Sequence, residues 1–158
     1  MTTNVLILCT HNSARSVLGE ALASTHPSGK FVGYSAGSTP GTSVNPIAAD
    51  IAEELGMDRA LLRSKSWDEF GLADSPKMDF IVTVCDNAAG EVCPFWPGKP
   101  ATAHWGFPDP SQVAGSDEDK RKAFREVMVG LKKRIDLLAE MPLDTLDSMS
   151  LHHIHSKV

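Results

Sequence analysis

The strongest constraint on the fold lies at the start of the chain, where an apolar run leads through a short polar loop into a helical pattern. Residues Val5 to Leu8 are aliphatic without interruption, which is typical of a buried central strand. The polar segment Cys9 to Ser16 follows, and Val17 to Ala23 has the apolar spacing of a helix. A strand, a loop and a helix in this order predict the opening of a βα unit.

The same alternation of strands and helices continues along the chain. We expect further strands over residues 31–36, 79–85 and 101–105, and helices over residues 45–56 and 116–140. This alternation predicts an α/β fold in which a parallel sheet is covered by helices on both faces. Sites in such folds lie at the carboxyl ends of the strands, and Cys9 and Cys85 both end a predicted strand. The two cysteines are therefore expected on the same rim of the sheet.

The length and composition fit a single globular domain. The chain has 158 residues, of which 42% are hydrophobic and 22% are charged, so one sizeable core can form. We expect a catalytic domain over residues 1–141, acting as a monomer. Residues 142–158 are then a C-terminal tail, which we expect to form a short docking helix.

Charge and hydropathy argue against several classes of partner. The net charge of −5 disfavours nucleic acid and acidic membrane surfaces. No apolar run approaches the roughly 18 residues of a membrane span, and the N-terminal run is too short for a signal peptide. We therefore expect a cytoplasmic protein. In that reducing compartment its three cysteines are expected to be reactive or buried thiols rather than a disulfide framework.

The loop after the first strand has the composition of an oxyanion site. The backbone N–H groups of Thr10, His11, Asn12, Ser13, Ala14 and Arg15 can converge on one point at a helix N-terminus. The Arg15 guanidinium can grip two oxygens of an anion. The same positive field favours a thiolate at Cys9, to which Ser16 can donate its hydroxyl. The alternative is that Cys9 is only a buried small residue at the end of a strand.

The sequence Cys-Thr-His-Asn-Ser-Ala-Arg-Ser resembles the phosphate loop of the low-molecular-weight tyrosine phosphatase fold. The resemblance runs from Val5 to about Glu140. It also includes the segments Ser35–Gly37, Val44–Pro46, Val82–Cys85 and His104–Pro110. The whole set is more similar to the arsenate reductases built on this fold than to the phosphatases. The resemblance implies a small four-stranded parallel sheet and a substrate of arsenate, with phosphate as a competing anion.

The resemblance also implies roles for residues outside the loop. Asp109 is expected to be the general acid that protonates the leaving oxygen; a turn aspartate before proline is the alternative. In some relatives an asparagine, a glutamate, a serine and an aspartate bind potassium near the loop. Asn12, Glu20 and Ser35 match the first three, and the ammonium of Lys65 at the fourth position is expected to replace the cation. Asn12 is also expected to adopt a left-handed turn.

Two further cysteines distinguish a reductase from a phosphatase. The thiol of Cys85 can attack the arsenic-bound sulfur of Cys9 and expel arsenite, and Cys93 can then take over the disulfide. If residues 86–92 form a helix, that helix must unwind for Cys85 and Cys93 to join. We expect no bound cofactor, and reduction by thioredoxin or by glutaredoxin with glutathione. A zinc site of Cys85, Cys93 and His104 is an alternative that the spacing disfavours.

Two other functions stay open from the sequence. One is a phosphomonoesterase that uses the same Cys9, Arg15 and Asp109. The other is a non-catalytic oxyanion-binding or redox-sensing protein, against which the predicted acid at Asp109 argues, because a sensor protonates no leaving group.

Overall fold

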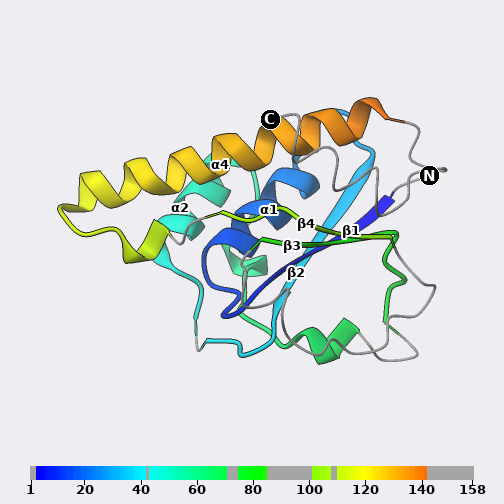
Figure 1. Cartoon of the computed structure of the whole chain (residues 1–158), viewed down its shortest axis with the longest axis horizontal. Helices are drawn as coiled ribbons and strands as arrows, with labels where there is room; N and C mark the ends of the chain where they lie inside the picture. Colours follow the sequence, from blue (N-terminus) through cyan, green and yellow to red (C-terminus); the bar gives the residue numbers. More distant parts are fainter. Residues whose placement is uncertain (1–2, 42, 71–74, 85–100, 108–109, 142–158) are drawn as a thin grey trace.

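Four parallel strands form the centre of the molecule (Figure 1). The structure is a computed structural model, and it describes residues 3–41, 43–70, 75–84, 101–107 and 110–141. The strands are β1 (Thr3–Cys9), β2 (Phe31–Gly37), β3 (Phe80–Thr83) and β4 (Ala101–His104). Their order in the sheet is β2-β1-β3-β4, and every pair is parallel.

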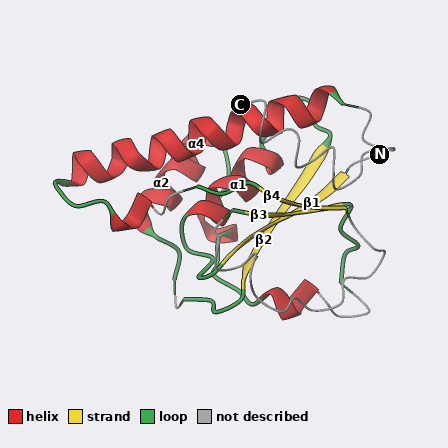
Figure 2. Cartoon of the chain, in the orientation of Figure 1, coloured by secondary structure: helices red, strands yellow, loops and turns green. Residues whose placement is uncertain are grey.

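Three α-helices cover one face of the sheet (Figure 2). They are α1 (Arg15–Ser24), α2 (Pro46–Leu55) and α4 (Asp117–Glu140). The alternate β1 side chains Val5 and Ile7 pack against them, while Leu6 and Leu8 face the opposite side. That side is covered in the described structure by the 3₁₀ helix η2 (Trp67–Phe70). The remaining short helices are η1 (Arg59–Leu61) and η3 (Pro110–Gln112).

The predicted fold class is confirmed, and so are the helix ends that have strong local signals. The side chain of Asn45 accepts a hydrogen bond from the N–H of Ile47 at 2.9 Å, and α2 ends at Gly56 with a φ of 106°. A capping box between Ser116 and Asp119 begins α4. The third strand is shorter than expected, ending at Thr83 instead of Cys85, and the fourth ends at His104 instead of Trp105.

The strand order determines where a site can form. The strand that follows β1 in the chain, β2, lies on one side of it, and β3 and β4 lie on the other. The direction in which successive strands are added to the sheet therefore reverses at β1. Crevices at such switch points, beyond the carboxyl ends of the strands, are the usual ligand sites of open α/β sheets. The loop between β1 and α1 begins at this point.

None of the helices in the described part of the chain combines the length and the hydropathy that crossing a membrane would require. The expected tail helix, residues 142–158, lies outside the described residues. The boundary at residue 141 therefore stays a prediction.

The close packing of α1 on β2 generates a stability prediction. A Cβ atom at Gly33 would collide with the backbone carbonyl of Glu20 and lie 2.9 Å from the Ser24 hydroxyl. We expect Gly33→Ala to lower the free energy of unfolding by about 1–3 kcal/mol, measured by urea denaturation. Gly41→Ala is the matched control, because its nearest atom would be 3.8 Å away. Equal free energies of unfolding for the two variants would contradict the close contact between Gly33 and α1.

Candidate active site

The loop that joins β1 to α1 turns its carbonyl groups outward. Four consecutive carbonyls, those of residues 10–13, each accept a hydrogen bond from a neighbouring segment. The donors, in order, are the N–H of Thr39 at 2.9 Å, the N–H of Gly41 at 3.0 Å, the Ser64 hydroxyl at 2.6 Å and the N–H of Asn45 at 2.8 Å. In a trans peptide the N–H points opposite to the carbonyl. The N–H groups of residues 11–14 therefore turn toward the interior of the loop, as an anion site requires.

The N-terminal end of α1 also favours an anion at this loop. Its N-cap residue is Ala14, which makes no capping hydrogen bond through its side chain, and its first turn has no acidic residue. Alanine is among the poorest N-cap residues, because it leaves the first N–H groups of a helix without an internal acceptor. This helix end suits an external anion as its acceptor.

Two candidate groups of the sequence lie at this loop. Cys9 ends β1 and is 5% exposed, on the side of the sheet that faces the helices. Ser16 lies in the first turn of α1 and is fully buried; its hydroxyl oxygen accepts a hydrogen bond from Nδ2 of Asn12 at 2.8 Å. A hydroxyl that accepts this bond still has its own hydrogen to donate, as the expected bond to the Cys9 sulfur requires.

Arg15 is anchored by the backbone that follows β4. Its Nη1 donates a hydrogen bond to the carbonyl of Phe107 at 2.8 Å. The N–H of Phe107 donates in turn to the carbonyl of Val84 at 3.0 Å, just beyond β3. The backbone that follows β4 is therefore tied both to the loop arginine and to the end of the neighbouring strand.

Asn12 holds the loop from within. Its φ of 50° is the left-handed conformation predicted from the sequence, and the residue is completely buried. Its amide nitrogen donates to the hydroxyls of Ser16 and Ser35 at 2.8 and 2.9 Å, and its amide oxygen accepts from the N–H of Lys65 at 3.0 Å. One side chain thus joins α1, β2 and the segment before η2.

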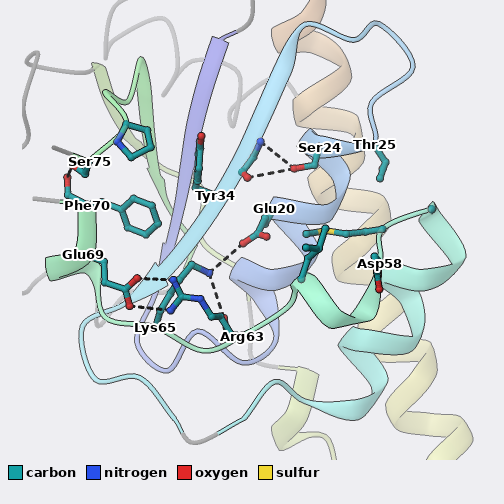
Figure 3. Close-up of a pocket in the computed structure, with 15 residues that line it drawn as sticks. Glu20, Ser24, Thr25, Tyr34, Asp58, Arg63, Lys65, Glu69, Phe70 and Ser75 are labelled. Atoms are coloured by element: carbon teal, nitrogen blue, oxygen red, sulfur yellow. Dashed lines mark hydrogen bonds and ion pairs between the residues drawn. The ribbon is translucent and has the colours of Figure 1, made fainter. Parts of the chain in front are cut away.

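Glu20 and Lys65 form a buried ion pair (Figure 3). The Ser35 hydroxyl donates to the Glu20 carboxylate at 2.5 Å, and Nζ of Lys65 lies 3.5 Å from the same oxygen. Burial lowers the pKa of Lys65, although the negative charge of Glu20 opposes this shift. The structure therefore brings together Asn12, Glu20, Ser35 and Lys65, the four residues expected to support the loop. The lysine ammonium lies beside the carboxylate.

A pocket of about 770 Å³ opens on the other side of this ion pair (Figure 3). Glu20 and Lys65 line it together with Tyr34, Phe70 and the exposed Arg63, which is paired with Glu69. None of the loop residues from Cys9 to Arg15 lines this pocket. The pocket therefore lies behind the loop, and an anion bound to the loop would not occupy it. Its lining comes from distant segments, and the sequence contained no signal for it.

Gly37 is a site residue whose role only the structure explains. It ends β2, beside the loop, where a Cβ atom would lie 2.5 Å from the carbonyl oxygen of Thr10 and 3.0 Å from the nitrogen of Asn12. Only glycine allows the loop backbone to approach β2 this closely. The sequence signal was the Ser35–Gly37 motif, without a reason for the glycine.

Three of the expected catalytic residues, Cys85, Cys93 and Asp109, lie outside the described residues, as does the segment 86–92 that we expect to unwind. Their positions and roles stay predictions. Of the alternative zinc ligands, His104 is described, and its Nδ1 hydrogen-bonds the Thr83 hydroxyl at 2.7 Å. In the described part of the chain, no group of three histidine, cysteine, aspartate or glutamate residues could hold a metal ion.

Comparisons with known proteins extend over most of the chain. The sequence profile of the family described as low molecular weight phosphotyrosine protein phosphatase matches residues 4–148. An arsenate reductase of Halalkalibacterium halodurans is 38% identical over 136 residues, covering 86% of this chain and 94% of the relative. The crystal structure of an arsenate reductase from Archaeoglobus fulgidus is 31% identical with a TM-score of 0.62, over 87% of this chain and 99% of that one.

A further solved structure, described as an arsenate reductase in the phosphate binding state, is 27% identical to this chain. Its TM-score is 0.64, and the match covers 88% of this chain and 98% of that one. The β1–α1 loop, the sheet and the three α-helices thus belong to a chain that is similar to these proteins over nearly its whole length.

The buried ion pair behind the loop generates a second prediction. Lys65→Met leaves the Glu20 carboxylate, whose side chain is only 10% exposed, without its cation. We expect a loss of about 3 kcal/mol or more in the free energy of unfolding, measured by chemical denaturation. Arg63→Met is the control, because the Arg63–Glu69 pair is exposed and should be worth less than about 1 kcal/mol. Similar losses in both variants would contradict a structural role specific to Lys65.

Proposed function

This chain belongs to the low molecular weight phosphotyrosine protein phosphatase family, and we propose that within this family it is an arsenate reductase. The observation that carries the proposal is the β1–α1 loop. Its outward carbonyls turn the N–H groups of residues 11–14 inward, at an α1 end whose N-cap residue, Ala14, makes no capping hydrogen bond through its side chain. Arsenate and phosphate have nearly the same shape and charge, and both suit this cradle. The names of the similar curated proteins favour arsenate reduction over phosphate ester hydrolysis.

In the proposed first step, the Cys9 thiolate attacks the arsenic atom of arsenate. A sulfur–arsenic bond forms, and one oxygen leaves as water after Asp109 has given it a proton. Arg15 grips two of the remaining oxygens, and the inward N–H groups stabilise the charge that develops on them. Ser16 donates its hydroxyl to the thiolate before the attack.

In the second step the Cys85 thiolate attacks the sulfur of Cys9. A Cys9–Cys85 disulfide forms, the electron pair of the sulfur–arsenic bond passes to arsenic, and arsenite leaves. Support comes from the strand ends, because Leu8 pairs with Thr83 and the N–H of Val84 donates to the carbonyl of Leu8 at 2.9 Å. The backbone immediately before Cys85 therefore lies beside the backbone immediately before Cys9.

In the third step Cys93 attacks Cys85 and frees Cys9 for the next cycle. The resulting Cys85–Cys93 disulfide is reduced by an external dithiol carrier, for which thioredoxin is the first candidate and glutaredoxin with glutathione the second. This chemistry fits a cytoplasmic protein, since a reducing compartment keeps the three thiols available.

The alternative is a phosphatase that uses the same loop, in line with the family description. A phosphotyrosine substrate usually needs an aromatic side chain beside the loop. Tyr34, the only tyrosine of the chain, packs against Phe70 instead, on the face of the sheet opposite to Cys9. Its position therefore counts against a phosphotyrosine slot built from this residue.

The proposal predicts distinct phenotypes for substitutions of Cys9 and Cys93. In a mixture with thioredoxin, thioredoxin reductase and NADPH, we expect arsenate to cause continuous NADPH oxidation by the wild-type chain. Cys9→Ser should form no arsenite, because it lacks the nucleophile. Cys93→Ser should form about one arsenite per protein and then stop, because the disulfide cannot move to the carrier.

Hydrolysis of p-nitrophenyl phosphate in parallel separates the two functions. Cys9→Ser should lose this activity, whereas Cys93→Ser should keep whatever the wild-type chain has. Ester hydrolysis without any arsenite, even in a single turnover, would refute the reductase and leave the phosphatase. Continued turnover by Cys93→Ser would keep the reductase and reject Cys93 as the relay thiol.

The position of Lys65 predicts indifference to potassium. Its ammonium lies beside Glu20, where potassium lies in some relatives, so the site already holds a positive charge. Replacing sodium by potassium at constant ionic strength should leave the rate of arsenate reduction unchanged. A several-fold gain in rate with potassium would show that the ammonium does not take the place of the cation.

A further inference from the structure

A glycine in the interior of α4 marks the starting point. Gly130 lies in the middle of this 24-residue helix, where glycine lowers helix stability relative to alanine. The reason for glycine lies outside the helix. A Cβ atom at this position would be 2.7 Å from Cε1 and 3.4 Å from Cζ of the Phe107 ring. The aromatic ring therefore occupies the space that any other side chain would fill.

Arg134 forms the second side of this slot. Its guanidinium carbon lies 4.7 Å from the centre of the Phe107 ring, and its Nη1 donates to the carbonyl of Gly130 at 2.7 Å. The residue is only 8% exposed, so the stacking is largely removed from water. The Phe107 ring thus contacts both the backbone surface at Gly130 and the planar guanidinium of Arg134 on the same helix.

The backbone of Phe107 is also fixed, by two hydrogen bonds. Its N–H donates to the carbonyl of Val84 at 3.0 Å, and its carbonyl accepts from Nη1 of Arg15 at 2.8 Å. With Nη1 fixed there, the opposite edge of the guanidinium, formed by Nε and Nη2, is the edge that can meet two oxygens of an anion. The hydrogen bond to the Phe107 carbonyl therefore contributes to the direction of the Arg15 guanidinium.

We propose that Phe107, seated in the slot formed by Gly130 and Arg134, is a positioning residue that orients Arg15 for oxyanion binding. The inference rests on the proposed function in one respect only, that Arg15 binds the oxyanion. Phe107 itself does not touch the reacting atoms in this scheme. Its effect is geometric: a shift of the ring in the slot moves the carbonyl, and the carbonyl moves the guanidinium.

The test fills the slot and measures inorganic phosphate binding by calorimetry. Gly130→Ala should raise the Kd for phosphate about tenfold, because misplaced binding groups lose much of their contribution. The gain in helix propensity opposes the cost of displacing the Phe107 ring, so we expect a thermal stability close to that of the wild-type chain. Weaker phosphate binding without a matching loss of stability would therefore not arise from a merely structural role. Val129→Ala, an exposed neighbour on α4, is the control and should leave the Kd unchanged.

A rescue variant tests whether the loss of phosphate affinity comes from displacement of the Phe107 ring. Combining Gly130→Ala with Phe107→Leu replaces the ring by a shorter side chain, and should recover most of the lost phosphate affinity. Phe107→Ala alone, which empties the slot instead of overfilling it, should weaken phosphate binding as Gly130→Ala does. Wild-type Kd values in both Gly130→Ala and Phe107→Ala would overturn the proposal, as would a double variant no better than Gly130→Ala.

This readout separates the inference from the proposed function, because phosphate binding needs no electron transfer. A wild-type chain that binds phosphate but forms no arsenite would refute the reductase and leave this test intact. A wild-type chain that binds neither phosphate nor arsenate would overturn both the oxyanion site and the role of Phe107.

Discussion

The buried amide of Asn12 is the interaction on which the rest of the site depends. It joins the first turn of α1 through Ser16, the end of β2 through Ser35 and the segment before η2 through the N–H of Lys65. A completely buried amide must satisfy its hydrogen bonds, since each unmade bond costs about 1–3 kcal/mol. All three contacts must therefore form together. The left-handed backbone at Asn12, which lies within the run of outward loop carbonyls, is held by the same contacts.

The loop is consequently held from two sides. Behind it, the Glu20–Lys65 pair lines a pocket and is linked to Asn12 through Ser35 and the N–H of Lys65. In front of it, Arg15 is tied through the Phe107 carbonyl to the slot on α4. Two features of the site lower stability locally, the alanine N-cap of α1 and the glycine within α4. Such costs are common where a protein gives up stability to preorganise a binding site.

The sequence by itself determined the elements whose signals are local. The aliphatic run at Val5 predicted β1, because a buried parallel strand needs continuous apolar residues. The Asn45–Pro46 pair and Gly56 predicted both ends of α2, and Ser116 the start of α4, because caps act within one helical turn. The loop from Cys9 to Arg15 could be predicted as a candidate oxyanion site for the same reason, since all its groups are consecutive.

Only the tertiary structure decided which distant groups complete the site. Phe107 is 92 residues from Arg15, and Lys65 is 45 residues from Glu20, so no local pattern connects either pair. The reasons for Gly37 and Gly130 are equally distant, because each glycine makes room for atoms of another segment. Sequence motifs identify groups that one stretch of backbone brings together. Packing between elements depends on the whole core, and it alone determines which carbonyl orients Arg15 and which side chains fill the space behind the loop.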